Sequence, residues 1–96
     1  MSNMILIPYR NQTFNFSPDM RLVIEIEQEL GALAMLRQKF SACVWKVTDL
    51  VTLTQMMLQA AGASVDYMEL GNDMLKAGLA PFLGAVRQLL EVVPAD

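Results

Sequence analysis

The fold of this chain is decided at residues 17–27, which read SPDMRLVIEIE. Ser17, Pro18 and Asp19 together are typical of a helix N-terminus, because side-chain oxygens cap the first free backbone N–H groups and proline suits the first helical position. The apolar residues that follow keep the spacing of a helix: Val23, Ile26, Leu30 and Leu33. The alternation of Ile and Glu also suits a strand, so the pattern leaves open whether residues 20–27 are entirely helical. We expect a helix with Ser17 as its N-cap.

Two short β-prone runs precede this helix, MILIPY at residues 4–9 and TFNF at residues 13–16. The segment between them contains Asn11, a residue that tolerates the backbone of a tight turn. We therefore expect a β-hairpin over residues 4–16, in which Pro8 shortens the first strand or confines it to an edge. A two-stranded hairpin is marginal alone, so it must pack against helices.

Glycines and small polar residues divide the rest of the chain. Gly31 is expected to end the first helix, or to kink it before a helical continuation over residues 32–40. Residues 41–47 are a β-prone connector, and Thr48 is the expected N-cap of a helix that Gly62 ends. The apolar stripe of that helix consists of Leu50, Leu53, Met57 and Ala60.

Ser64 is the expected N-cap of the next helix. Its predicted outer face consists of Asp66, Glu69, Asp73 and Lys76, and its predicted inner face of Met68, Gly71 and Leu75, with Met74 as a further candidate. The last helix follows Gly78 and Pro81, and Pro94 stops it. Its stripe consists of Phe82, Leu83, Val86, Leu89, Leu90 and Val93.

These patterns predict a mainly α protein, with an N-terminal β-hairpin followed by four or five short helices packed around one core. We expect a single domain over residues 1–96, made of the hairpin at 4–16, a helical body at 17–93 and a tail at 94–96.

The composition suggests that part of the apolar surface faces another protein. Hydrophobic residues are 54% of the 96, and charged residues are 18% against a typical value of about 25%. Such a balance excludes bulk disorder. A domain of this size buries only about 60% of the surface that its unfolded chain exposes. The excess is therefore expected to contact a second copy or a partner.

Nucleic acid and membrane are not expected partners. The net charge is −3 and the basic residues are scattered. The longest uncharged run, residues 50–65, is shorter than the roughly 20 residues of a spanning helix. The start shows no signal-peptide pattern, so we expect a cytoplasmic protein.

No pattern of catalytic, metal-binding or cofactor-binding residues is present. The chain has no His, and its single cysteine, Cys43, lies among apolar neighbours, so we expect a buried structural thiol rather than a nucleophile. One cysteine cannot form an intrachain disulfide or supply a zinc site. Glu25, Glu27 and Glu29 are expected to form a solvated face. We therefore expect neither an enzyme nor a cofactor.

The eight methionines indicate where a partner could bind. Methionine fills irregular gaps in a core, and it also forms adaptable binding surfaces. Core packing is the default interpretation of these side chains, and a Met-lined groove for a partner helix is the alternative. The candidate partner-binding residues are Trp45, Met56, Met57, Met68, Met74, Leu79, Phe82 and Leu83.

Residues 63–70, ASVDYMEL, resemble the motif in which a serine of acyl carrier proteins carries phosphopantetheine. Ala63 stands where that motif has an aspartate, and an N-cap role accounts for Ser64 without any modification. A carrier modified at Ser64 is kept as a remote alternative.

The order of segments over residues 5–93 resembles the small tail assembly chaperones of long-tailed phages, prophages and gene transfer agents. The resemblance rests on MRLVIEIE at 20–27 with its Leu30-Gly31 stop, the Thr48-Asp49-Leu50 start, the Ala60-Ala61-Gly62 end, and Gly78-Leu79-Ala80 leading into VRQLL at 86–90. The Ile/Glu alternation of the first helix departs from the family, whose members use more Ala and Leu there.

The resemblance implies a non-enzymatic protein that acts in the host cytoplasm during phage assembly. Such chaperones bind the tape measure protein, help to recruit tail tube subunits around it, and are absent from the finished tail. An apolar, deformable surface would also self-associate when unoccupied, so we expect homo-oligomers. A structural or adaptor phage protein that stays in the particle remains the alternative.

Overall fold

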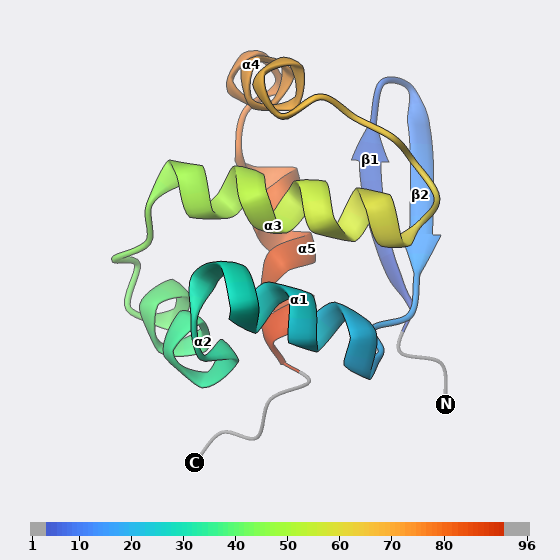
Figure 1. The fold of residues 1–96 in the computed structure, drawn as a ribbon. Coiled ribbons are helices and arrows are strands. Elements are labelled where there is room, and N and C mark those ends of the chain that lie inside the picture. Colours follow the sequence, from blue (N-terminus) through green and yellow to red (C-terminus); the bar gives the residue numbers. More distant parts are fainter. Residues whose placement is uncertain (1–3, 92–96) are drawn as a thin grey trace.

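The computed structural model describes residues 4–91. The first two elements of this part of the chain form an antiparallel hairpin. Five helices follow (Figure 1). The elements are β1 (Ile5–Tyr9), β2 (Gln12–Phe16), α1 (Met20–Leu30), α2 (Leu33–Ser41), α3 (Val47–Ala60), α4 (Tyr67–Ala77) and α5 (Ala80–Leu90). The predicted fold class is therefore confirmed. Val93, Pro94 and the predicted tail lie outside the described residues.

A two-residue turn joins the strands. Arg10 and Asn11 have φ angles of 50° and 63°, the pair of positive values that a type I′ turn requires and that matches the twist of the flanking strands. Tyr9 therefore faces Gln12, and Gln12 belongs to β2 rather than to the turn. The side chains of Ile5, Ile7 and Tyr9 are buried, whereas those of Leu6 and Pro8 point to solvent.

The first helix starts two residues later than expected. Asp19, not Ser17, is the N-cap of α1, because its carboxylate directly precedes the first helical residue and accepts a 3.0 Å hydrogen bond from the backbone N–H of Leu22. Ser17 and Pro18 lie in the connection from β2. Residues 20–27 are entirely helical, which settles the ambiguity of the Ile/Glu alternation.

Gly31 ends α1 as expected, with a φ of 93° that favours glycine. The N-terminus of α2 has no capping side chain of its own among the described residues. Instead, the Glu27 carboxylate reaches across from α1 and accepts a 2.9 Å hydrogen bond from the N–H of Leu33. One side chain thus fixes the bend between the two helices.

The expected caps of α3 and α4 are both wrong. Thr48 lies inside α3, which begins at Val47 after Lys46, and its backbone carbonyl accepts a bond from the Thr52 hydroxyl. Asp66 caps α4 by accepting a 3.0 Å bond from the N–H of Glu69, while Ser64 stays exposed in the preceding loop. A carboxylate directly before the first helical residue satisfies the N3 amide, and a hydroxyl further upstream is not used.

The connector after α2 contains no strand. The backbone makes a turn at Cys43, with φ 59°, and continues into α3. Trp45 stacks on the buried ring of Phe40, with ring centroids 5.5 Å apart and planes within 1° of parallel. This aromatic pair covers one end of the core.

The core surrounds α3, which has α1 below it, α4 above it and α5 behind it in Figure 1. Its buried residues are Leu50, Val51, Leu53, Thr54, Met56, Met57 and Leu58. Ala60, expected in the stripe, is exposed at the C-terminal end. The hydroxyl of Thr54 donates to the carbonyl of Leu50 at 2.8 Å, so its burial leaves no unpaired group. α5 adds Val86 and Leu89 to this core and packs against β1.

The capping arrangement gives a direct test. Asp19→Ala should lower the free energy of unfolding by about 1 kcal/mol, because the N–H of Leu22 loses its acceptor. Ser17→Ala, the matched control, should change it by less than about 0.5 kcal/mol. Urea unfolding followed by circular dichroism measures both. Equal losses in the two variants would contradict the assignment of Asp19 as the cap.

Candidate functional site

The eight side chains predicted to face a partner fall into three groups. Four are buried in the core, namely Met56, Met57, Met74 and Phe82. Three are half-buried at its margin, namely Trp45, Leu79 and Leu83. Met68 alone of the eight is fully exposed. The structure therefore does not bring them together as one surface, and a partner could reach the completely buried Met57 and Met74 only if the helices separate.

The outer face of α4 carries an exposed apolar stripe. Met68 and Leu75 have 67% and 63% of their surface accessible, and they lie seven residues apart, so they share one face. The inner face of α4 is formed instead by Leu70 and Met74. The prediction of Met68 and Leu75 as inner residues is wrong, because Leu70 and Met74 occupy the face that packs on the core. The prediction of Gly71 as an inner residue is confirmed, since it lies against Val51 of α3. The prediction of Met74 as an inner residue is confirmed.

Other exposed apolar side chains lie on separate faces, and sequence reasoning did not single out most of them. Within residues 4–91, the large exposed apolar side chains are Met4, Leu6, Met20, Ile24, Met35, Val44, Val47, Met68 and Leu75. The i, i+4 pair of Met20 and Ile24 was visible in the sequence. The predicted buried stripe of this helix included Val23 and Ile26, and the pair outside it was not assigned to a partner surface.

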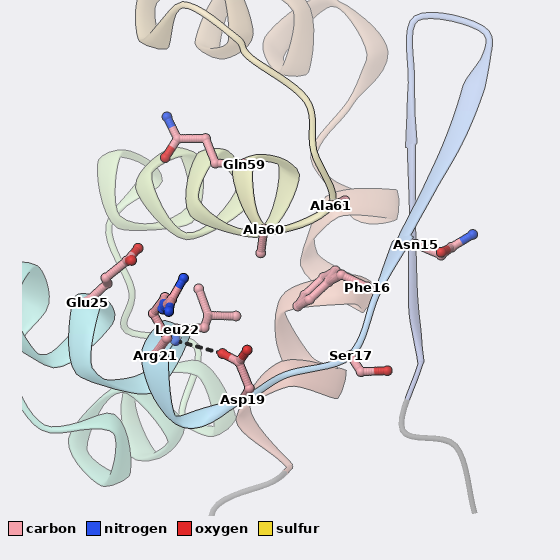
Figure 2. Close-up of a pocket in the computed structure, with 10 residues that line it drawn as sticks. All are labelled: Asn15, Phe16, Ser17, Asp19, Arg21, Leu22, Glu25, Gln59, Ala60 and Ala61. Carbon is pink, nitrogen blue, oxygen red and sulfur yellow. Dashed lines mark hydrogen bonds between the residues drawn. The ribbon is translucent and has the colours of Figure 1, made fainter.

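A polar groove runs between α1 and α3. Its first hollow has a volume of about 530 Å³ and is drawn in Figure 2, where Phe16 points toward the helices and Asn15 points away. A second hollow of about 430 Å³ shares Glu25 and Gln59 with it. Asp19 lies at this groove, but its carboxylate is already bonded to the N–H of Leu22. The groove thus offers polar contacts and no nucleophile paired with a base.

A charged cluster ties the hairpin tip to α4. Asp73 Oδ2 accepts hydrogen bonds from the Tyr9 hydroxyl and the Arg10 Nε, each at 2.9 Å, and Arg10 Nη2 lies 2.9 Å from the same oxygen. Glu69 is 3.7 Å from the Arg10 guanidinium. The bonds from Tyr9 and Arg10 lower the pKa of Asp73, while burial and the bond to Asp73 raise the pKa of Tyr9. Asp73, predicted to be an outer residue, is therefore half-buried and has a structural role.

A more apolar hollow lies beside this cluster, under the hairpin tip. It has a volume of about 520 Å³ and is lined by Pro8, Pro81 and Phe82 among others. Of the eight predicted partner-binding residues, Met56 lines the second hollow between α1 and α3, and Phe82 lines this one. Tyr9 and Asp73 at the rim supply the polar contacts.

In the part of the chain that the structure describes, the cysteine and carboxylate side chains form no catalytic or metal-binding arrangement. Cys43 is exposed rather than buried, contrary to the prediction, because the left-handed turn after α2 directs its side chain outward, where Arg87 Nη2 lies 3.9 Å from its sulfur. Among residues 4–91, no three side chains of the metal-binding types are grouped as a metal would require. Ser64 lies in the loop before α4 and not at a helix start, where the acyl-carrier motif places its modified serine, so the structure does not favour that alternative.

A family model described as "phage tail tube protein, GTA-gp10" matches residues 6–94, nearly the whole length. The chain belongs to this phage tail family. The curated proteins and the solved structures gave no match. Membership confirms the coarser part of the resemblance, a phage tail-related protein. Within residues 4–91, no helix of this tail protein is long and apolar enough to cross a membrane.

The cluster at the hairpin tip makes stability depend on acid pH. Asp73→Asn should lower the melting temperature at pH 7, because Tyr9 and Arg10 lose a charged acceptor. The folded-state pKa of Asp73 lies below its ordinary value of 3.8, so its contribution is present above that pH and is lost as pH falls through the lowered pKa. The melting temperatures of the two proteins should therefore converge in that range.

Thermal unfolding at a series of pH values between 7 and the acid limit measures this convergence. Glu69→Gln is the matched control, and it should have the smaller effect because its contact with Arg10 is longer and more exposed. A constant difference between wild type and Asp73→Asn across the acid range would contradict the assignment.

Proposed function

We propose that this tail-family protein is a non-enzymatic assembly chaperone, which binds the tape measure protein and helps tail tube subunits assemble in the host cytoplasm. The observation that carries the proposal is the set of exposed apolar side chains on helix faces, above all Met68 and Leu75 on α4. Membership of the phage tail family supports the setting in which such a protein would act.

The outer face of α4 has the geometry that an amphipathic helix needs in a partner. Met68 and Leu75 provide two apolar contacts one heptad apart, and Asn72 lies between them with Gly71 beside it. A partner helix binds such a stripe through its own i, i+3, i+4 and i+7 residues. Methionine adapts to different apolar shapes, which suits a chaperone that binds many segments of a long helical chain.

The other exposed apolar residues would let the protein contact its partner at more than one place. Met20 and Ile24 lie on α1, whereas Val44 and Val47 flank the stacked Trp45. We infer that Trp45 and Leu83 extend the apolar surface at the margins, and that the buried Met56, Met57, Met74 and Phe82 keep the helices in place behind it. Scattered single residues would need no explanation, but a heptad pair on one helix is a binding pattern.

A second candidate function is a structural role in the tail itself. The family description names a tail tube protein, and this wording favours a subunit that stays in the particle. The two functions differ in one measurable respect. A chaperone leaves before the tail is complete, whereas a tube component is present in every particle.

Co-expression tests the chaperone role. The tape measure protein should be soluble with the wild-type chain, and Met68→Gln/Leu75→Gln should reduce the recovered complex about tenfold or more, because each side chain loses roughly 1.5 kcal/mol of apolar burial. Gln88→Asn on α5 is the control, since it changes an exposed polar residue outside this stripe. A tape measure protein that stays insoluble with the wild-type chain would contradict the proposal.

Mass spectrometry of purified particles separates the two functions. The chaperone proposal expects the chain to be absent from the finished tail and present in assembly intermediates. Detection in stoichiometric amount with the tube would instead support the structural role.

A further inference from the structure

The outer edge of β2 is an unpaired row of backbone groups. The pair that closes a two-residue hairpin, Tyr9 with Gln12, is hydrogen-bonded, and bonded and non-bonded pairs then alternate along the ladder. The N–H and C=O groups of Thr13 and Asn15 consequently point away from β1. Within residues 4–91, no backbone or side-chain hydrogen bond engages these groups. In Figure 1, β2 is the strand at the rim of the molecule, whereas β1 packs against α5.

The two edges of the hairpin differ in how well they resist pairing. On β1, the outward-facing positions are Leu6 and Pro8, and a proline has no N–H to donate. On β2, residues 12–16 contain no proline, no charge and no bulge in the register. Exposed edges usually carry at least one of these protections. The edge of β2 is thus open to another strand, and the edge of β1 is not.

Phe14 adds a side-chain reason for pairing. It lies opposite Ile7 on the face of the hairpin that covers the core, yet it is only partly buried, whereas Ile7 is completely buried. An aromatic ring on the core side of an edge strand gains cover when a further strand extends the sheet.

We infer that β2 pairs antiparallel with β2 of a second copy of this chain, about a two-fold axis at Phe14. In this register Thr13 lies opposite the partner's Asn15, and Asn15 opposite the partner's Thr13. Each such pair exchanges two backbone hydrogen bonds, so all four outward groups of each strand are satisfied. Phe14 meets the partner's Phe14 as a closely spaced, non-bonded pair, which brings the two rings together on the core side.

The strand is self-complementary, which is why the occupant is a second copy and not an unrelated segment. A two-fold axis makes both contacts identical, and the uncharged strand brings no like charges face to face. The resulting sheet has the order β1-β2-β2-β1, with Pro8 on both outer edges. Growth therefore stops at the dimer instead of continuing into a fibre. This interface goes beyond the proposed chaperone function and does not depend on it.

Charge substitutions on the solvent face test the pairing and its register. Thr13 and Asn15 are exposed, and their hairpin neighbours are Pro8 and Leu6, so charges at these positions leave the monomer intact. Thr13→Lys/Asn15→Lys places like charges opposite each other at both pairs and should convert the dimer to a monomer of 10.7 kDa. Thr13→Lys/Asn15→Glu, the matched control, places opposite charges across the axis and should keep the dimer.

Analytical ultracentrifugation at micromolar concentration gives the mass of each protein, and circular dichroism checks that each is folded. A monomeric wild type, or a dimer that both double variants retain equally, would overturn the inference. A monomer for the first variant and a dimer for the second would support it.

Cross-linking provides a second measurement that does not depend on charge. In a Cys43→Ser background, Phe14→Cys should form a disulfide-linked dimer on mild oxidation, since Cα atoms of a non-bonded pair lie roughly 4.5 Å apart. Leu6→Cys in the same background is the control. Its side chain lies on the far strand, and it should give little cross-linked product. Equal cross-linking of the two variants would overturn the register.

Discussion

The burial of α3 is the constraint on which the rest of this structure depends. α1, α4 and α5 all pack against it, and its middle turns are apolar on nearly every side. Such a helix is not stable in water by itself, and it becomes stable only when the neighbouring helices bury its apolar side chains. Gly71 of α4 lies against Val51, and Thr54 can be buried because it bonds within the helix. The surplus of apolar residues is thereby largely used inside the molecule.

The order and type of the elements could be predicted from local pattern, but the helix starts could not. Periodicity identified the hairpin and all the helices, and Gly31 and Gly62 marked ends correctly because a positive φ is a local property of the backbone. The caps were wrong at Ser17, Thr48 and Ser64. Each lies one to three residues from a competing start, and the outcome depends on which helical phase buries more surface in the assembled core.

Local pattern also could not predict which apolar side chains of α4 are exposed. Met68, Leu75 and Met74 are equally apolar in the sequence, and a shift of helical phase decides which of them faces α3. Asp73 contributes to that phase, since its bonds to Tyr9 and Arg10 hold α4 against a hairpin more than sixty residues away. No local pattern contains such a contact. The exposed Cys43 is a further case, because the left-handed turn after α2 directs its side chain outward.

The packing of β1 against α5 has a consequence for synthesis on the ribosome. Among the elements of residues 4–91, the hairpin is synthesised first, and the helix that packs against β1, with its buried Ile5 and Ile7, is synthesised last. Until α5 has been synthesised, the nascent chain therefore carries an apolar hairpin without the helix that packs against β1. The hairpin can be covered only after α5 has been made, and any product truncated before α5 keeps these strands accessible to the cell's proteases and holdases.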